Sequence, residues 1–187
     1  MESGYGASPA RFRGFPGGDF ALRLLLFATS LSALVVLATS KQSKSIPVPI
    51  SPQLTINISR SAKFSHSPAL IYLLVALSAT TLYSIISLII SATSFRSKSF
   101  PSSSKLFRLM VLDLLMGGIM AAATGSAGSV AYIGLKGNSH VLWNKICNIF
   151  DEFCRHVGSS TLLSLIASAL LFLLVLLSAY SIYRRSH

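Results

Sequence analysis

The sequence predicts an all-α fold: an integral membrane four-helix bundle with cytosolic termini and two extracellular loops. Four long apolar stretches run through the 187 residues, at 20–39, 69–92, 109–135 and 157–183. These stretches contain only two charged side chains, Arg23 and Asp113. A helix needs about 20 apolar residues to cross the hydrocarbon core, and it satisfies its own backbone hydrogen bonds, which lipid cannot do. The pattern therefore predicts four membrane-spanning helices, over about 20–39, 69–92, 109–133 and 159–182.

Composition and charge exclude several other classes of protein. Charged residues make up 11% of the chain, against about 25% in soluble domains, and the connectors are too short for a stable soluble core. The net charge of +11 is scattered over every connector, whereas a nucleic-acid-binding protein gathers its basic residues on one face. We therefore expect no nucleic-acid partner. Basic connectors beside membrane helices instead set topology and contact the anionic headgroups of membrane lipids.

The first 19 residues are rich in Gly, Pro and Arg and show no periodicity, which predicts a disordered cytosolic tail. Asp19 is a suitable N-cap for the first helix. The four-transmembrane domain then covers 20–185, and 186–187 form a cytosolic C-terminal end. An alternative interpretation makes 1–39 a cleaved signal peptide, which would leave three spans. The long apolar run and the lengthy segment before it favour a retained helix.

The positions of the basic residues predict which side of the membrane holds the termini. With four spans both termini lie on the same side, which then carries nine basic residues against seven on the other. Five of the nine stand close to helix ends, where the positive-inside bias acts. These five are Arg23, Arg96, Arg108, Arg184 and Arg185. The pattern favours cytosolic termini.

The first outward loop, at 40–68, contains helix breakers and a glycosylation pattern. Pro47, Pro49 and Pro52 exclude a helix. Apolar and polar residues alternate over 54–58, which is the pattern of a short strand, but five residues are too few to establish one. Asn57, followed by Ile58 and Ser59, is an N-glycosylation acceptor pattern, which has meaning only in an extracellular or lumenal loop.

Cys147 and Cys154 are the only cysteines, and both fall in the second outward loop, where oxidation is permitted. We predict a disulfide between them, with two free thiols as the alternative. His140 and His156 lie nearby, but the spacing matches no common zinc site. We expect no metal and no cofactor. The chain also lacks the short motifs of catalytic and phosphate-binding sites, so we expect no enzyme.

The two charges within the apolar stretches predict an ion pair. Asp113 inside a membrane helix costs about 2.5–3.5 kcal/mol on insertion scales, so it normally faces a partner or a cavity. Arg23 stands at a similar depth if both helices start at the cytosolic face. A pair would reduce the burial cost of both charges and fix the contact between the first and third helices. Two alternatives remain: Arg23 reaching up to the headgroups, and Asp113 lining a proton or ion pathway.

The third predicted helix carries small residues at every fourth position, at Gly117, Ala121, Gly125 and Ser129. Such small-xxx-small ridges let helix backbones approach closely in lipid. The fourth helix has Ser160, Ser164 and Ser168 at the same spacing. Packing within the bundle explains both ridges. Contacts between protein copies are the alternative, and both can hold together.

The loop from Leu135 to His156 contains a distinctive sequence, LKGNSHVLWNKICN, followed by Phe150, Phe153 and Cys154. It resembles the second extracellular loop of plant CASP-like proteins, which are relatives of the Casparian-strip membrane domain proteins and are MARVEL-related. The similarity extends from Asp19 to Arg185. It includes Ala38-Thr39-Ser40-Lys41-Gln42, Ser67-Pro68-Ala69, and the positions of Arg23 and Asp113.

The resemblance implies a plasma-membrane protein with four spans and cytosolic termini that forms homodimers, heterodimers with related chains, and larger assemblies. It also implies that Arg23 and Asp113 are the arginine and aspartate landmarks of the family. Better-known members form membrane platforms that direct local cell-wall modification. The first outward loop, with its prolines and Asn57, departs from strip-forming members, so no role in the Casparian strip itself is implied. The leading hypothesis is a non-enzymatic scaffold, and the runner-up is a transporter or channel subunit with Asp113 in a polar pathway.

Overall fold

The computed structural model describes residues 16–51, 54–96, 103–138, 140 and 143–186. Within these ranges the chain forms α1 (Pro16–Ala38), β1 (Lys41–Ser51), β2 (Leu54–Lys63), α2 (Pro68–Arg96), α3 (Ser103–Lys136) and α4 (Asp151–Ser186). A turn of 3-10 helix, Phe64–His66, precedes α2. Each of the four helices is long and apolar enough to cross a membrane. The predicted four-helix membrane bundle is therefore confirmed.

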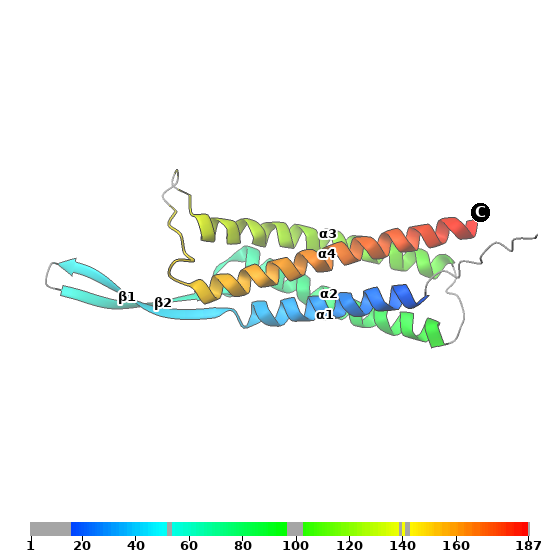
Figure 1. Ribbon diagram of the computed structural model, residues 1–187, viewed down its shortest axis with the longest axis horizontal. Coiled ribbons are helices and arrows are strands. Elements are labelled where there is room, and N and C mark those ends of the chain that lie inside the picture. Colours follow the sequence, from blue (N-terminus) through cyan, green and yellow to red (C-terminus); the bar gives the residue numbers. More distant parts are fainter. Residues whose placement is uncertain (1–15, 52–53, 97–102, 139, 141–142, 187) are drawn as a thin grey trace, which may run out of the picture.

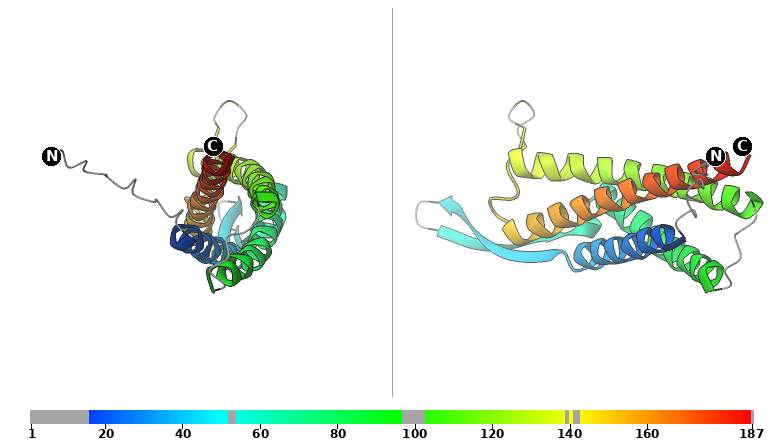
Figure 2. Two further views of the ribbon diagram at one scale, coloured as in Figure 1. Left: turned by 90° about the vertical axis from the view of Figure 1, so that its right-hand side faces the viewer. Right: turned by 45° about the vertical axis from the view of Figure 1, so that its right-hand side comes forward.

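The four helices are arranged in a ring, in which α1 and α3 each pack on α2 and α4 (Figures 1 and 2). The start of α1 and the end of α4 lie at one end of the bundle, which we call the terminal end. The β-hairpin and the α3–α4 loop lie at the opposite end, which we call the hairpin end. The side of the membrane that each end faces stays a prediction.

Apolar side chains fill the interior of the bundle and also cover its outside. Leu26, Leu73, Met120 and Leu171, one from each helix, are fully buried in the core. Many equally large side chains, such as that of Leu176, are exposed on the outer face. Lipid tails are as apolar as leucine, so this outer surface is well solvated in a bilayer. This distribution of apolar side chains is that of a helix bundle surrounded by lipid.

The helices extend beyond the predicted boundaries, especially at the starts of α3 and α4. α4 begins at Asp151 rather than near 159, and Asp151 and Glu152 in its first turn suit the positive end of the helix dipole. α1 begins at Pro16, and proline is tolerated in a first helical turn. Asp19 therefore lies inside α1, although the sequence had indicated an N-cap. The remainder of the predicted tail, 1–15, lies outside the described residues.

The connection between α1 and α2, which the sequence predicts to be the first outward loop, contains far more strand than the sequence indicated. β1 and β2 pair antiparallel from Lys41 opposite Lys63 to Ser51 opposite Leu54. In a two-stranded ribbon, alternate residues direct their N–H groups away from the partner strand. Pro47 and Pro49 are two positions apart, so they share one of these registers, and proline can occupy an edge position. The prolines do exclude a helix, but they are compatible with a long hairpin.

Candidate functional site

A buried ion pair joins α1 to α3 near the terminal end of the bundle. Arg23 Nη2 lies 3.2 Å from Asp113 Oδ2, and Arg23 Nη1 donates to Asp113 Oδ1 at 3.4 Å. Only 1% of the Arg23 side chain and 0% of the Asp113 side chain are exposed. This two-pronged arrangement matches the fork geometry of a guanidinium with a carboxylate. The structure therefore brings together the two charges that the sequence singled out.

A second carboxylate, that of Asp19, reaches the same arginine. Arg23 Nε donates to both oxygens of Asp19, at 3.1 and 3.2 Å, one helical turn apart on α1. Ser91 Oγ on α2 donates to Asp19 Oδ2 at 2.7 Å. The Asp19 side chain is 35% exposed, so it forms the outer edge of the arrangement.

Tyr83 on α2 completes the arrangement. Its hydroxyl donates to Asp113 Oδ1 at 2.6 Å. We use the name charge cluster for Asp19, Arg23, Tyr83, Ser91 and Asp113. One cation thus lies between two anions, and polar groups of α2 bind both anions. The cluster fastens three of the four helices at one depth, and it satisfies charges that would otherwise be costly in lipid.

Sequence reasoning missed three of the five members of the charge cluster. For Asp19 a signal existed, because its spacing of four residues from Arg23 is that of an intrahelical ion pair. Tyr83 and Ser91 lie in a stretch without charges, where the sequence does not reveal which face of the helix turns inward.

Close contacts between α3 and α4 depend on small and hydroxyl side chains. A Cβ atom on Gly117 would stand 3.5 Å from Leu171 Cβ and 3.6 Å from the Phe172 ring. Further along, Thr124 Oγ1 donates to Ser164 Oγ at 2.9 Å. Ser160, Ser164 and Ser168 of α4 are all buried. The serine spacing in α4 therefore serves packing within the bundle.

The ridge on α3 behaves differently. Gly117 is buried, but Ala121, Gly125 and Ser129 are exposed, and a Cβ atom on Gly125 would meet nothing within 4 Å. A helix with 3.6 residues per turn rotates by about 40° for each four-residue step, so the ridge winds about 120° away from Gly117 by Ser129. Packing within the bundle accounts for the start of the ridge and leaves the rest facing outward.

At the hairpin end, the α3–α4 loop carries a disulfide. Cys147 in the loop and Cys154 in α4 are bonded, with their Cα atoms 5.6 Å apart. The backbone N–H groups of Ile146 and Cys147 donate to the carbonyl of Gly134, at 3.0 and 3.2 Å, which holds the loop against the end of α3. Both thiols are in the disulfide, so neither is available to a metal in this state.

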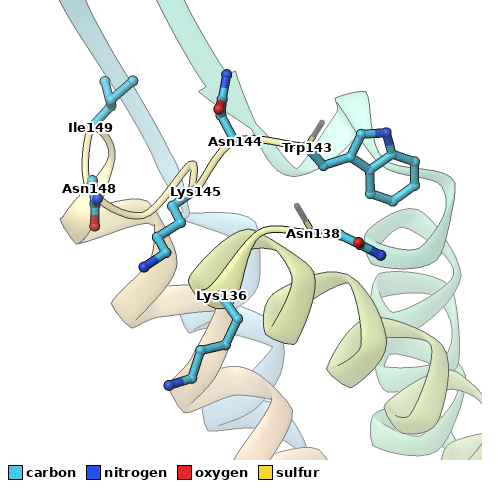
Figure 3. A pocket seen from close by; sticks show the side chains of 7 residues that line it. All are labelled: Lys136, Asn138, Trp143, Asn144, Lys145, Asn148 and Ile149. Carbon is cyan, nitrogen blue, oxygen red and sulfur yellow. The ribbon is translucent and has the colours of Figure 1, made fainter. Parts of the chain in front are cut away.

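A hollow of about 550 Å³ opens in the same loop (Figure 3). We call it the loop hollow. Its lining includes Lys136, Asn138, Trp143, Asn144, Lys145 and Asn148. Asn138 and Trp143 exchange two backbone hydrogen bonds of 2.9 Å and so lie directly opposite each other. Gly137, with a φ of 69°, makes the turn into this pairing, and a Cβ there would come within 2.7 Å of the Trp143 carbonyl oxygen.

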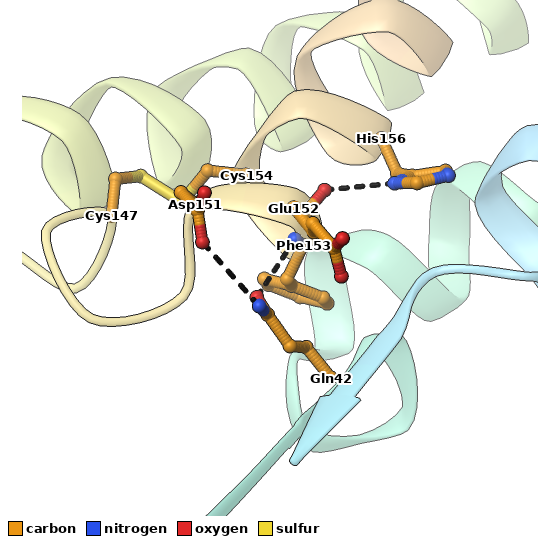
Figure 4. Close-up of a disulfide and its surroundings, with 7 residues drawn as sticks. All are labelled: Gln42, Cys147, Asp151, Glu152, Phe153, Cys154 and His156. Carbon is orange, nitrogen blue, oxygen red and sulfur yellow. Dashed lines mark hydrogen bonds between the residues drawn. A yellow bond between two sulfur atoms is a disulfide. The ribbon is translucent and has the colours of Figure 1, made fainter. Parts of the chain in front are cut away.

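The base of the hairpin is attached to the start of α4, close to the disulfide (Figure 4). Lys44 Nζ lies 3.1 Å from Asp151 Oδ1, and Gln42 Nε2 donates to the same oxygen at 3.4 Å. The backbone N–H of Phe153 donates to Gln42 Oε1 at 3.2 Å. Both side chains of the Lys44–Asp151 pair are largely exposed.

Two further observations bear on the sequence predictions. Asn57 lies in β2 opposite Pro47, but its side chain lies outside what the structure describes. Among the described residues, no group of three or more His, Cys, Asp or Glu side chains is placed to hold a metal ion.

Four apolar spans, a buried charge cluster and a crosslinked loop define a multi-pass membrane protein. The chain matches the Casparian strip membrane protein domain over residues 13–170, and it belongs to that family. The resemblance seen in the sequence is therefore confirmed. No solved structure matches the chain significantly.

Its relatives are plant proteins that match it along most of its length. It is 59% identical to CASP-like protein 1D1 of Musa acuminata over 98% of this chain and 94% of that protein. It is 55% identical to CASP-like protein 1D1 of Oryza sativa subsp. japonica, over 100% of this chain and 90% of the relative. CASP-like protein 1D1 of Arabidopsis thaliana is 48% identical over 88% of this chain and 82% of its own length.

Proposed function

We propose that this protein is a non-enzymatic plasma-membrane scaffold. It associates with itself and with related CASP-like chains, organises a membrane subdomain, and so guides local modification of the cell wall. In this proposal the terminal end faces the cytosol and the hairpin end faces outward. Membership of the Casparian strip membrane protein domain family and the basic residues near helix ends at the terminal end support it.

The observation that carries the proposal is the outward face of α3, by which we mean the side of this helix that points away from the rest of the bundle. Gly118, Ala121, Ala122, Gly125 and Ser129 are all exposed there. Side chains added at Gly118 or Gly125 would meet nothing within 4 Å in the monomer. Small side chains on a helix face make few van der Waals contacts with lipid tails. They do allow the backbone of a second helix to approach closely, and such close packing is the main source of helix association in membranes. We infer that this face of α3 contacts another copy or a relative.

A crosslinking experiment tests the proposal directly. Gly125→Leu adds bulk to the outward face of α3 without touching the monomer, and Ala169→Leu adds the same bulk to an exposed position on α4. We expect the first change to reduce crosslinked dimers of the full-length protein in plasma membranes, and the second to leave them unchanged. Equal crosslinking in both variants would rule out this face as the contact.

The runner-up, a transporter or channel subunit with Asp113 in a polar path, receives less support. Asp113 Oδ1 accepts hydrogen bonds from Arg23 and Tyr83, Asp113 Oδ2 accepts one from Arg23, and the side chain is fully buried. These contacts favour a structural role. Flux in proteoliposomes separates the two functions: ion or solute flux that Asp113→Asn abolishes, with crosslinked assembly intact, would establish the transporter instead.

A further inference from the structure

The loop hollow contains an unusual combination of side chains for a surface of this size. An exposed indole, three amides and two ammonium groups line an open hollow of about 550 Å³, a volume within the usual range of small-molecule sites. The Trp143 side chain is 56% exposed although it is large and apolar.

Each kind of side chain in the hollow suits one part of an acidic sugar. The flat face of an indole packs against the C–H face of a pyranose ring, as it packs against other apolar surfaces. Amides donate and accept hydrogen bonds, as sugar hydroxyls require. An ammonium group binds a carboxylate by a charge-assisted hydrogen bond. A uronate, which carries all three features, satisfies the whole set.

The geometry fits an extended chain of such sugars. Figure 3 shows the Trp143 indole and the Asn138 amide at one end of the hollow, while Lys136 and Lys145 extend in a common direction toward the other end. The backbone pairing of Asn138 with Trp143 fixes both residues of the first group. Lys145 is held beside the turn, because its Cγ lies 3.3 Å from the position of a Cβ on Gly137. A sugar chain with one ring on the indole would therefore have to extend across the hollow for a carboxylate to reach the lysines.

The electrostatics also favour an anionic ligand. Neither Lys136 nor Lys145 forms an ion pair with another residue in the part of the chain that the structure describes. The two outward loops, with the start of α4, carry seven basic residues against Asp151 and Glu152. A surface with one dominant sign of charge raises the local concentration of oppositely charged ligands.

We propose that the loop hollow binds an acidic polysaccharide of the cell wall, with Trp143 stacking on a sugar ring and Lys136 and Lys145 pairing with uronate carboxylates. The inference rests on the proposed function, because the hollow meets the wall only if the hairpin end faces outward. It adds a physical link between the membrane scaffold and the wall.

The chain offers a site-specific reporter, since Trp143 is its only tryptophan. The full-length protein, in nanodiscs of zwitterionic lipid and calcium-free buffer, is titrated with a short oligogalacturonate while indole fluorescence is recorded. We expect a saturable change in fluorescence. The fully methyl-esterified oligomer, which keeps the sugar rings but lacks the charges, is expected to give no saturable change at the same concentrations. Equal responses to both oligomers, or no response to either, would overturn the proposal.

Paired lysine variants separate a site from diffuse attraction. Lys136→Gln with Lys145→Gln removes two charges from the hollow, and Lys41→Gln with Lys63→Gln removes two from the exposed hairpin. The loss of charge-assisted hydrogen bonds predicts that the first pair raises the dissociation constant at least about tenfold. The hairpin pair is expected to leave it almost unchanged. Equal weakening by both pairs would contradict a defined site.

Calorimetry on tryptophan variants tests the stacking. Trp143→Phe is expected to retain binding and Trp143→Ala to lose it, with the disulfide mapped in each variant to show that the loop is intact.

The rival role for Trp143 is an anchor at the membrane surface. If the indole responds when anionic lipid is added to the zwitterionic nanodiscs but does not respond to oligogalacturonate, the anchor role is correct. Crosslinked dimers that persist when the sugar fails to bind would overturn this inference and leave the scaffold standing.

Discussion

The two ends of the bundle are each fastened by an ion pair, and the two pairs are physically very different. At the terminal end, Arg23 and Asp113 are 1% and 0% exposed. At the hairpin end, Lys44 and Asp151 are 44% and 67% exposed at a nearly equal distance of 3.1 Å. Burial removes water as an alternative partner. Breaking the first pair by loss of Asp113 therefore leaves the Nη1 and Nη2 groups of a buried guanidinium without their acceptor, whereas water replaces a lost partner in the second pair. Contact distance alone therefore does not indicate what a pair contributes.

The largest effect is expected from breaking the buried pair. Asp113→Ala leaves Arg23 buried with only Asp19 beside it, and removing one partner of a buried pair costs about 3–5 kcal/mol. We expect strongly reduced delivery to the cell surface and a lower unfolding temperature in detergent. The double variant with Arg23→Leu also removes the buried guanidinium and is expected to do less damage. Equal damage from the single and double changes would count against direct pairing.

An intermediate effect is expected at the hairpin end from removing the crosslink. Cys147→Ser with Cys154→Ser opens a ring with a sequence separation of 7, which by loop-entropy reasoning is worth about 2.5 kcal/mol. We expect lower thermal stability of the loop, measured by hydrogen exchange, with the helices little changed. Non-reducing mass mapping of the unaltered protein provides the control, and free thiols at both positions would refute the crosslink.

The smallest effect is expected from the exposed pair. Lys44→Gln removes the ion pair with Asp151, but exposed pairs contribute little and are screened by salt. We expect an unfolding temperature in detergent that is almost unchanged at physiological salt. Gln42→Ala is the variant to compare with it, because this change removes both the hydrogen bond from Gln42 to Asp151 and the one that Gln42 accepts from the Phe153 backbone N–H. A loss of stability from Lys44→Gln as large as that from Asp113→Ala would remove the distinction between the two ends.

The sequence sufficed for features that depend on composition along the chain. Spans, the pairing of Arg23 with Asp113, and the proximity of Cys147 and Cys154 all follow from apolar length, from the cost of burying charge, and from short spacing. Features that depend on helix rotation did not follow. Tyr83 could not be assigned to the charge cluster, and the α3 ridge could not be divided into its buried start at Gly117 and its exposed remainder.

The hairpin shows a different limit of sequence reasoning. Proline at 47, 49 and 52 excludes a helix and lowers the strand propensity of the same segment. The pairing that begins with Lys41 opposite Lys63 joins residues that lie apart in the sequence. Periodicity within one strand does not reveal which residues of the other strand lie opposite it. The alternation at 54–58 indicated only the middle of that strand.

The hairpin continues almost directly from α1, since only Thr39 and Ser40 separate Ala38 from Lys41. Ser40 is buried, and its hydroxyl donates to the Leu37 carbonyl at 2.6 Å, which stiffens this junction. Strand residues advance by about 3.3 Å each, so the tip stands roughly 30 Å from the junction. The ribbon is consequently a lever arm: a small tilt of the first helix against its neighbours becomes a wide sweep of the tip.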